Sequence, residues 1–216
     1  EKKYSLKKVY SIKNIPLIDN YALRGSRILK DKFKINNGDT LYIYQGGLFE
    51  HRGIRILLDV FSKMPLDRHI VFMGFGQLEQ LIKEHELNFS NIHFQPAVEP
   101  RDIPAYTSSA DVGIALIENI CLNHYYALPN KIFEYLLSGL PIIVSDFPDM
   151  GKFIDKYDCG WKIPVSEKVL TELLMSISKD DIAHKGSKVL ICRDKLGSEL
   201  ETEALLEIYQ SAVGLG

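Results

Sequence analysis

The chain alternates short apolar runs with longer stretches in which apolar residues recur every three or four positions. The runs predict buried strands, and the three-to-four spacing predicts helices with one buried face. Strands are expected near 40–45, 69–74, 91–95, 111–117, 141–145 and 160–163. Helices are expected near 52–63, 77–87, 101–109, 130–138, 149–157, 166–178, 180–192 and 199–213. This alternation predicts an α/β fold, a Rossmann-like doubly wound parallel sheet of about six strands.

Length and composition agree with one compact unit. The chain has 216 residues, of which 46% are hydrophobic and 25% charged, and this excludes disordered, collagen-like and low-complexity classes. The cysteines Cys121, Cys159 and Cys192 form no CxxC pair. Neither a disulfide framework nor a zinc site is therefore expected, and we interpret them as core thiols in a reducing compartment.

Charge is distributed unevenly along the chain. Residues 1–34 contain ten Lys and Arg against three Asp and Glu, so the remainder is acidic and is not expected to bind nucleic acid. The basic segment could contact anionic lipid or pack beside an acidic neighbour, and the second interpretation is favoured because the segment has no amphipathic helix. With no apolar run long enough for a bilayer and no signal peptide, a cytoplasmic protein is expected, with peripheral membrane contact left open. The missing initiator Met suggests a fragment.

In a doubly wound sheet, ligands bind beyond the carboxyl ends of the strands, so the loops there are the candidate sites. The first such loop holds Gly46 and Gly47, which would let backbone N–H groups approach an anion, with Arg52 within reach. A tight turn with a solvated arginine is the alternative. The second loop holds Gly74 and Gly76 but lacks the rest of a dinucleotide fingerprint, so close packing or room for a base or sugar is expected there.

The most informative segment is the helix expected at 130–138. Pro129 suits the first helical position, which leaves the N–H groups of Asn130 and Lys131 free to meet an anion. Glu134 lies away from the buried stripe of the helix, and no i,i+4 partner is present for it. The stripe itself is expected to consist of Ile132, Phe133, Leu136 and Leu137.

No single element of this segment binds tightly enough by itself. A helix dipole contributes at most about 2 kcal/mol to an anion and a charge-assisted hydrogen bond about 1.5 to 3 kcal/mol, whereas micromolar affinity needs about 8 kcal/mol. Convergence of the helix start, Lys131, Arg52 and the Gly46–Gly47 loop on one diphosphate would suffice. A carboxylate one turn deeper, at Glu134, would then suit the paired hydroxyls of a ribose. Of the histidines, only His124 lies close to this segment in sequence, and a ligand role and a structural role are equally open for it.

Together these segments resemble a known family. The succession QGGLFEHRG, IVFMGFGQLEQL, NIHFQPAVEPRDIPAYTSSADVGIALI, LPNKIFEYLLSGLPIIVSD and ETEALLEIY is similar to the C-terminal half of glycosyltransferase family 4 (group 1), retaining enzymes with the two-domain B-type fold. The resemblance covers residues 39–165 and the last helix. Its specific part is the PNKxFEYxxxGxPII segment.

The resemblance implies a domain that binds a nucleoside diphosphate sugar of UDP or GDP type, with no cofactor and no metal. Gly46, Gly47, Arg52, Pro129, Asn130 and Lys131 would hold the diphosphate, and Glu134 the ribose. Arg52, Lys131 and Glu134 would also assist catalysis, by stabilising the departing diphosphate. Contacts to the base or sugar are expected from Gly74, Pro96, Ala97, Val98, His124, Tyr126 and Leu128.

Two positions depart from the family pattern. The family usually has Arg where this chain has Gly47, and Lys131 is expected to replace that cation. The family's paired-glutamate motif has Tyr126 in its first position, which leaves the sugar and the retention of configuration open. A nucleotide-sugar epimerase and a non-catalytic nucleotide-binding or protein-interaction module therefore remain alternatives.

The resemblance also implies a division of the chain. Residues 1–38 are expected to link two domains, 39–195 to form the donor-binding domain, and 196–216 to form a helix that folds back on an absent N-terminal acceptor domain. An apolar patch should then be exposed. The expected role is the donor half of a hexosyltransferase in bacterial surface polysaccharide synthesis, inactive alone.

Overall fold

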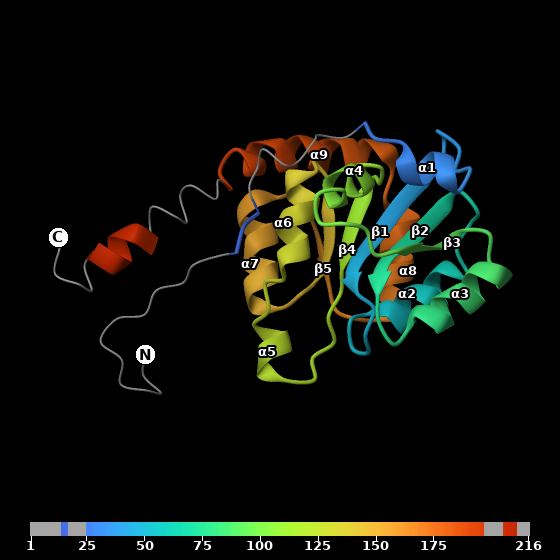
Figure 1. Cartoon of the computed structure of the whole chain (residues 1–216), viewed down its shortest axis with the longest axis horizontal. Coiled ribbons are helices and arrows are strands. Elements are labelled where there is room, and N and C mark those ends of the chain that lie inside the picture. Colours follow the sequence, from blue (N-terminus) through green and yellow to red (C-terminus); the bar gives the residue numbers. More distant parts are fainter. Residues whose placement is uncertain (1–13, 17–24, 197–204, 211–216) are drawn as a thin grey trace.

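A computed structural model of the chain describes residues 14–16, 25–196 and 205–210 (Figure 1). Its centre is a six-stranded sheet of order β3-β2-β1-β4-β5-β6, and every strand pair is parallel. The strands are β1 (Thr40–Gly47), β2 (Arg68–Phe75), β3 (Ile92–Pro96), β4 (Val112–Ala115), β5 (Ile142–Ser145) and β6 (Gly160–Ile163). The predicted α/β fold, a doubly wound parallel sheet of about six strands, is confirmed.

Helices cover both faces of the sheet (Figure 1), which explains why the strands are apolar runs rather than alternating ones. In β1, Tyr42 and Tyr44 pack into the core on one face, and Leu41 and Ile43 into the core on the other. The first face is covered by α2 (Ile54–Phe61), α3 (Glu79–Asn88) and α8 (Glu167–Ser176). The second is covered by α1 (Ile28–Lys32), α4 (Ile103–Thr107), α6 (Asn130–Leu137), α7 (Pro148–Tyr157) and α9 (Lys179–Arg193).

The strand order reverses direction at β1. From β1 the chain continues to β2 and β3 on one side, and returns to β4, β5 and β6 on the other. A crevice forms at the carboxyl ends of two strands whose connections leave on opposite faces, which here are β1 and β4. The residues that follow β1 and β4 are therefore the ones the fold places at its ligand-binding edge.

The structure adds elements that the pattern did not predict. Within residues 1–38, expected to be a linker, the short helix α1 packs on the domain, with Leu29 completely buried. A second short helix, α5 (Leu122–Tyr125), lies between β4 and α6. Residues 205–210 are helical, in agreement with part of the helix expected at 199–213, whose other residues lie outside the described part. Of the expected core thiols, Cys159 and Cys192 are buried but Cys121 is exposed, so the interpretation of Cys121 was wrong.

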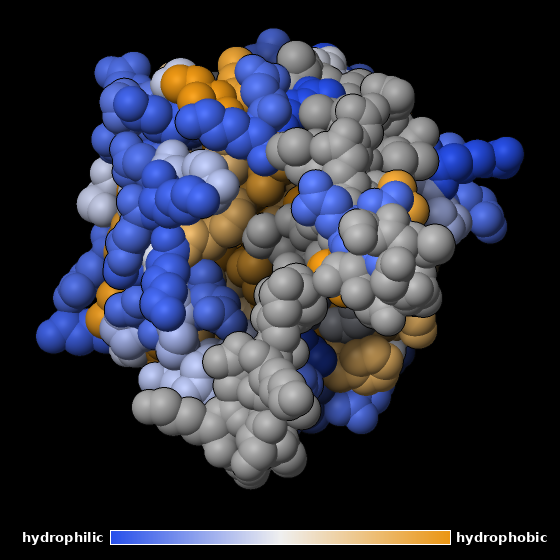
Figure 2. Space-filling view, turned by 90° about the vertical axis from the view of Figure 1, so that its left-hand side faces the viewer, coloured by the Kyte–Doolittle hydropathy of each residue, from blue (hydrophilic) through white to orange (hydrophobic). Residues whose placement is uncertain are grey.

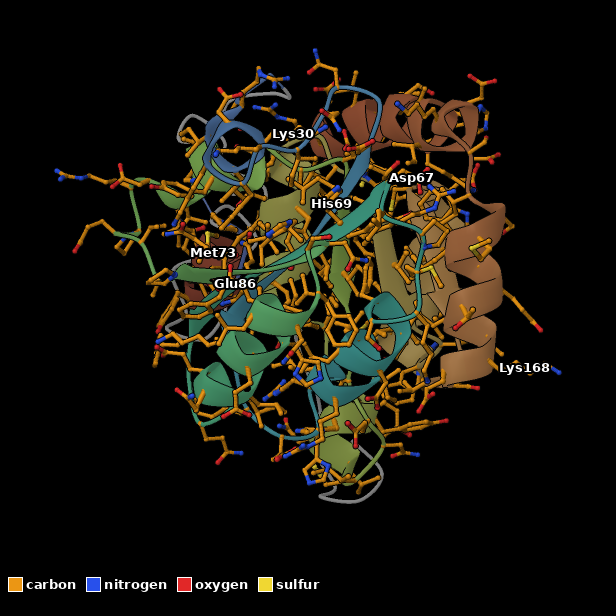
Figure 3. The ribbon with its side chains drawn as sticks, turned by 90° about the vertical axis from the view of Figure 1, so that its right-hand side faces the viewer. Lys30, Asp67, His69, Met73, Glu86 and Lys168 are labelled. Atoms are coloured by element: carbon orange, nitrogen blue, oxygen red, sulfur yellow. The ribbon has the colours of Figure 1, made fainter. Side chains whose placement is uncertain are left out.

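At the β3 edge of the sheet, a side chain accepts a hydrogen bond from the backbone of the strand. Among the described residues β3 pairs only with β2, and its outward-facing Phe94 N–H donates to Glu86 Oε1 at 2.9 Å. Glu86 lies on α3, which runs alongside that edge (Figure 3). One of the backbone donors of the edge strand is thereby satisfied within the molecule.

Two histidines stack inside the domain beneath α1. His69 lies on β2 (Figure 3), and its Nδ1 is 3.1 Å from His93 Nε2 on β3. The ring of Phe33 also stacks on His93. Asp39 Oδ2 lies 3.5 Å from His69 Nε2. Burial lowers the pKa of His93 to about 4, assisted by its neighbour His69, and burial also lowers the pKa of His69 despite Asp39. The fold therefore holds this pair neutral.

We predict that the domain loses stability in mild acid because of this pair. A histidine whose pKa is depressed by folding stabilises the fold above its unfolded pKa of about 6.5, and that contribution is lost as pH falls toward about 4. For His93 the loss between pH 7.5 and pH 5 is about 2 kcal/mol. Urea unfolding at both pH values checks this: His93→Gln should flatten the pH dependence, and the exposed His184→Gln should not. Equal slopes in all three proteins would contradict the prediction.

Candidate functional site

The end of β1 and the start of α6 meet at the carboxyl edge of the sheet. Gly46 has φ +106°, which favours glycine, and the Lys131 side chain from the first turn of α6 lies against it. Both Cε and Nζ of Lys131 lie 3.7 Å from where a Cβ on Gly46 would stand. The structure thus brings together two of the residues predicted from separate segments of the sequence.

Lys131 is a cation in an unusual environment. Its ammonium lies 3.6 Å from the centroid of the Tyr44 ring, and no carboxylate of the described residues lies within ion-pair distance of it. Burial and, to a smaller extent, the positive charge of Arg52 lower the pKa of Lys131 to about 7, with Glu134 partly opposing both. An anion placed beside Lys131 would favour its protonated form.

Arg52 stands on the other side of this edge, just before α2. It is half-buried, and its positive charge acts to lower the pKa of both Tyr44 and Lys131. The chain reaches it through Gly47, where an added Cβ would lie 2.7 Å from the Phe49 ring. Two positive side chains and the N-terminus of an eight-residue helix therefore face the same region, an arrangement that suits an anion with two or more negative charges.

The helix α6 begins at residue 130, as the predicted range has it, but Pro129 is not its first helical residue. Pro129 is the N-cap, with extended backbone angles, and Asn130 is the first helical residue. The predicted stripe is confirmed, because its four residues, Ile132, Phe133, Leu136 and Leu137, are all buried. Tyr135 is buried as well, although the pattern did not place it in the stripe.

Glu134, one turn into α6, is held by β1. Its Oε2 accepts a hydrogen bond of 2.5 Å from Gln45 Nε2, and the Oε1 of Gln45 lies 2.6 Å from the Thr107 hydroxyl on α4. The Tyr135 hydroxyl accepts from the Gln45 backbone N–H at 2.9 Å and donates to the Ile114 carbonyl at 3.2 Å. The carboxylate thus belongs to a network that joins α6, β1 and α4.

The residues predicted to contact a base or sugar lie on both sides of this centre. Gly74 stands opposite Gly46 in register and Pro96 opposite Gly74, so they extend the edge across β2 and β3. A Cβ on Gly74 would lie 1.9 Å from the Gly46 carbonyl oxygen, so close packing of the strands already requires this glycine. Ala97 is exposed beyond β3, and Val98 packs against the core.

The loop after β4 holds the remaining candidates. Tyr126 is 55% exposed and meets Tyr125 edge-on, whereas His124 Nδ1 lies 3.0 Å from the Glu118 carbonyl, which gives His124 a structural partner. Tyr126 and Leu128 also line a cavity of about 500 Å³ whose other lining residues are Asn14, Asn130, Phe133, Asp149, Lys152, Phe153, Lys156 and Tyr157. On the side of the molecule that carries α7, Figure 2 shows a hollow with hydrophobic residues at its floor.

Three residues of this centre were missed in the sequence: Gln45, Thr107 and Tyr135. Gln45 could have been found, because it is a polar residue at the carboxyl end of an otherwise apolar strand, and a buried amide needs a partner. Tyr135 and Thr107 carry no such signal, since their partners come from residues 90 and 62 positions away in the chain.

Comparison with known protein families shows to which family the chain belongs. The family described as "Glycosyl transferases group 1" matches residues 26–189. The chain belongs to this family. No curated protein matches the chain. The match begins before α1, so the group 1 unit includes part of the segment expected to be a linker.

Solved structures share the fold of this group 1 glycosyl transferase chain. WaaG, a glycosyltransferase involved in lipopolysaccharide biosynthesis, superposes with a TM-score of 0.71 at 18% identity, over 89% of this chain and 54% of its own. Anabaena HepE in complex with UDP-glucose gives 0.75 at 16% identity, over 93% and 57%. Sucrose-phosphate synthase from Thermosynechococcus elongatus gives 0.73 at 15% identity, over 95% and 53%. The chain thus spans little more than half the length of these proteins.

Two further observations bear on partners. The described residues contain no group of three or more His, Cys, Asp or Glu side chains that could hold a metal ion. Within the same residues, every helix is too short or too polar to cross a bilayer.

We predict that the Tyr135 hydroxyl stabilises the site's framework. Replacing Tyr135 by Phe removes the acceptor of the buried Gln45 N–H, and an unsatisfied buried donor costs about 1 to 3 kcal/mol. Denaturant unfolding of the Tyr135→Phe variant measures the loss. The same change at Tyr209, which is 63% exposed, should alter stability by less than about 0.5 kcal/mol. Equal effects at both positions would contradict the prediction.

Proposed function

We propose that the chain binds a nucleoside diphosphate sugar, of UDP or GDP type, at the carboxyl edge of β1 and β4. It would serve as the C-terminal, donor-binding domain of a retaining hexosyltransferase of family 4, with the B-type fold. The observation that carries this proposal is the position of the Lys131 ammonium beside Gly46 at the start of α6. Among the described residues, no carboxylate forms an ion pair with it.

The diphosphate lies against the start of α6 in this proposal. The backbone N–H groups of Asn130 and Lys131 have no intrahelical acceptor, so they can donate to its oxygens. Lys131 and Arg52 neutralise its charge, and Gly46 and Gly47 leave the space that a side chain would fill. Because negative charge grows on the diphosphate as the glycosidic bond to it breaks, these groups stabilise the transition state more than the bound donor.

The ribose and the base extend from the diphosphate along the edge of the sheet. Glu134 accepts hydrogen bonds from the ribose hydroxyls, one turn deeper than Lys131 on α6. Gly74 and the residues Pro96, Ala97 and Val98 face the base, and Tyr126 with Leu128 and His124 faces the sugar. With Tyr126 in place of the family's first glutamate, an aromatic ring that is 55% exposed would meet the donor sugar.

The proposal also concerns the longer protein of which this chain would be the donor-binding domain. The solved structures run to nearly twice the length of this chain, and we propose that an N-terminal half binds the acceptor. Side chains exposed at the carboxyl edge, Phe49 and Phe75, and on residues 205–210, Leu206 and Tyr209, would then meet that half. The chain alone would bind donor and transfer nothing. A role in bacterial surface polysaccharide synthesis, at the inner face of the membrane, fits the printed role of WaaG.

A second candidate function is a non-catalytic nucleotide-binding module, which the chain favours through Gly47 and Tyr126. Both functions require nucleotide binding, so the first experiment is a thermal-shift screen of the chain against UDP, GDP, ADP, CMP and their sugars. A ligand at about 100 times its dissociation constant adds about 2.7 kcal/mol. No shift with any of them would remove both functions. Transfer by the full-length protein, abolished by Arg52→Ala, would separate them.

We predict that Glu134→Ala weakens binding of UDP, or of GDP if the screen selects it, by about 1 to 3 kcal/mol, because charge-assisted hydrogen bonds to the ribose are lost. Isothermal titration calorimetry measures the change. Glu172→Ala is the matched control, since Glu172 lies on α8 with 63% of its side chain exposed. An unchanged dissociation constant for Glu134→Ala would remove the ribose from the proposed role of Glu134.

We also predict that UDP binding weakens as pH rises above about 7. In the free protein the pKa of Lys131 is about 7, so above that pH the ammonium must first regain a proton, at a cost of up to about tenfold in affinity per pH unit. The phosphate itself does not titrate there, since its second pKa is about 6. Titration calorimetry from pH 6.5 to 9 checks this. Lys131→Arg, which stays charged, should remove the slope, and a slope that persists in it would contradict the prediction.

A further inference from the structure

Gln45 is the last buried residue of β1 before the two glycines. Only 2% of its surface is exposed, and its backbone N–H donates to the Tyr135 hydroxyl at 2.9 Å. That hydroxyl is fixed in turn by the Ile114 carbonyl on β4. The main chain at Gln45 is therefore held between two strands and α6, so its side chain emerges from a rigid support.

The side-chain amide has one orientation that satisfies both of its neighbours. A carboxylate has no proton to donate, so the Gln45 NH₂ group must face Glu134, whose Oε2 lies 2.5 Å away. The Gln45 carbonyl oxygen then faces the Thr107 hydroxyl at 2.6 Å, and that hydroxyl shares its one proton between this oxygen and the Ile103 carbonyl at 2.8 Å. The carboxylate thus sets the orientation of the amide, Thr107 is the partner of the amide oxygen, and the amide NH₂ group in turn holds the carboxylate.

This arrangement acts on the carboxylate rather than on a ligand. One oxygen of Glu134 is held by a charge-assisted hydrogen bond from a buried group, while Glu134 itself remains partly exposed. The other oxygen and the remaining lone pairs stay available. A free glutamate on a helix surface samples many rotamers, and each must be given up on binding, so a carboxylate held in advance binds more tightly.

We propose that Gln45 is the positioning residue that presents Glu134 to the ribose hydroxyls, and that it sets the preference of the site for a ribonucleotide. This inference rests on the proposed function, in which Glu134 binds the ribose. Gln45 touches neither the diphosphate nor the sugar in this proposal. Its effect is confined to hydroxyl recognition, which distinguishes it from the cations around Lys131.

The test compares UDP with 2′,3′-dideoxyuridine diphosphate, which lacks both ribose hydroxyls. The wild-type chain should bind UDP about 10- to 100-fold more tightly, the range expected for hydrogen bonds to a charged group. Gln45→Met keeps the length of the side chain and removes the amide. In this variant the ratio of the two dissociation constants should fall to within about threefold of unity, with the dideoxy nucleotide bound about as in the wild type.

Two further variants locate the effect. Glu134→Ala should abolish the preference, and the double variant with Gln45→Met should lower it no further, because both changes remove the same interaction. Asn91→Leu is the matched control for the loss of a buried amide. Asn91 is 2% exposed and donates to the Phe61 and Arg68 carbonyls at the opposite end of the sheet. In Asn91→Leu the ratio of the two dissociation constants should equal that of the wild type.

Gln45→Glu covers the case in which Gln45→Met does not fold. The introduced carboxyl group keeps the shape of the side chain and can still accept from Thr107. It also places an oxygen against Glu134, and two adjacent carboxylates raise the pKa of one of them. The ribose preference should therefore be lost at pH 8 and return as pH falls, when the new carboxyl group is protonated and donates as the amide does. A purely structural role would show no such recovery.

The outcomes distinguish a failure of the inference about Gln45 from a failure of the proposed function. If Glu134→Ala abolishes the preference but Gln45→Met and Gln45→Glu retain it at pH 8, the inference about Gln45 is overturned and the proposed function stands. If the wild type binds both nucleotides equally, the ribose role of Glu134 fails, and with it the inference. If it binds neither UDP nor the corresponding GDP pair, the proposed function itself fails.

Discussion

The site depends on one contact, the packing of the Lys131 side chain against Gly46. Gly46 ends the buried part of β1 with a φ of +106°, a backbone conformation that favours glycine, and the first turn of α6 brings the Lys131 side chain against it. The ammonium rests on the Tyr44 ring, which belongs to the same strand and is buried in the core on one face of the sheet. The strand β1 therefore supplies the surface against which the Lys131 ammonium lies.

The sequence predicted the features that depend on local periodicity. All six strands were placed because runs such as Ile142–Ser145 are buried on both faces and stand out from their neighbours. The stripe of α6 followed from helical spacing. The helix termini were less certain, and Pro129 proved to be the N-cap rather than the first helical residue, since a single backbone angle separates the two positions.

The contacts that join distant segments could not be predicted in this way. Glu134 was singled out from the helical spacing of its own segment, but its partner Gln45 lies 89 positions earlier and is brought near only by the fold. Periodicity also says nothing of a five-residue helix such as α1, which completes one turn and gains its stability from Leu29 in the core. Cys121 was misjudged for a related reason, because exposure of a short loop helix has no periodic signal.

The hydrogen bond from Phe94 to Glu86 has a consequence for how copies of the protein behave together. An open edge strand offers a template on which another chain can build, and such growth leads to aggregation. At β3 the helix α3 supplies an acceptor to an outward amide, and the partly exposed carboxylate of Glu86 there discourages an incoming strand. One outward donor of β3 is thereby unavailable to a strand from another copy, so Glu86 makes this border a poorer template for pairing.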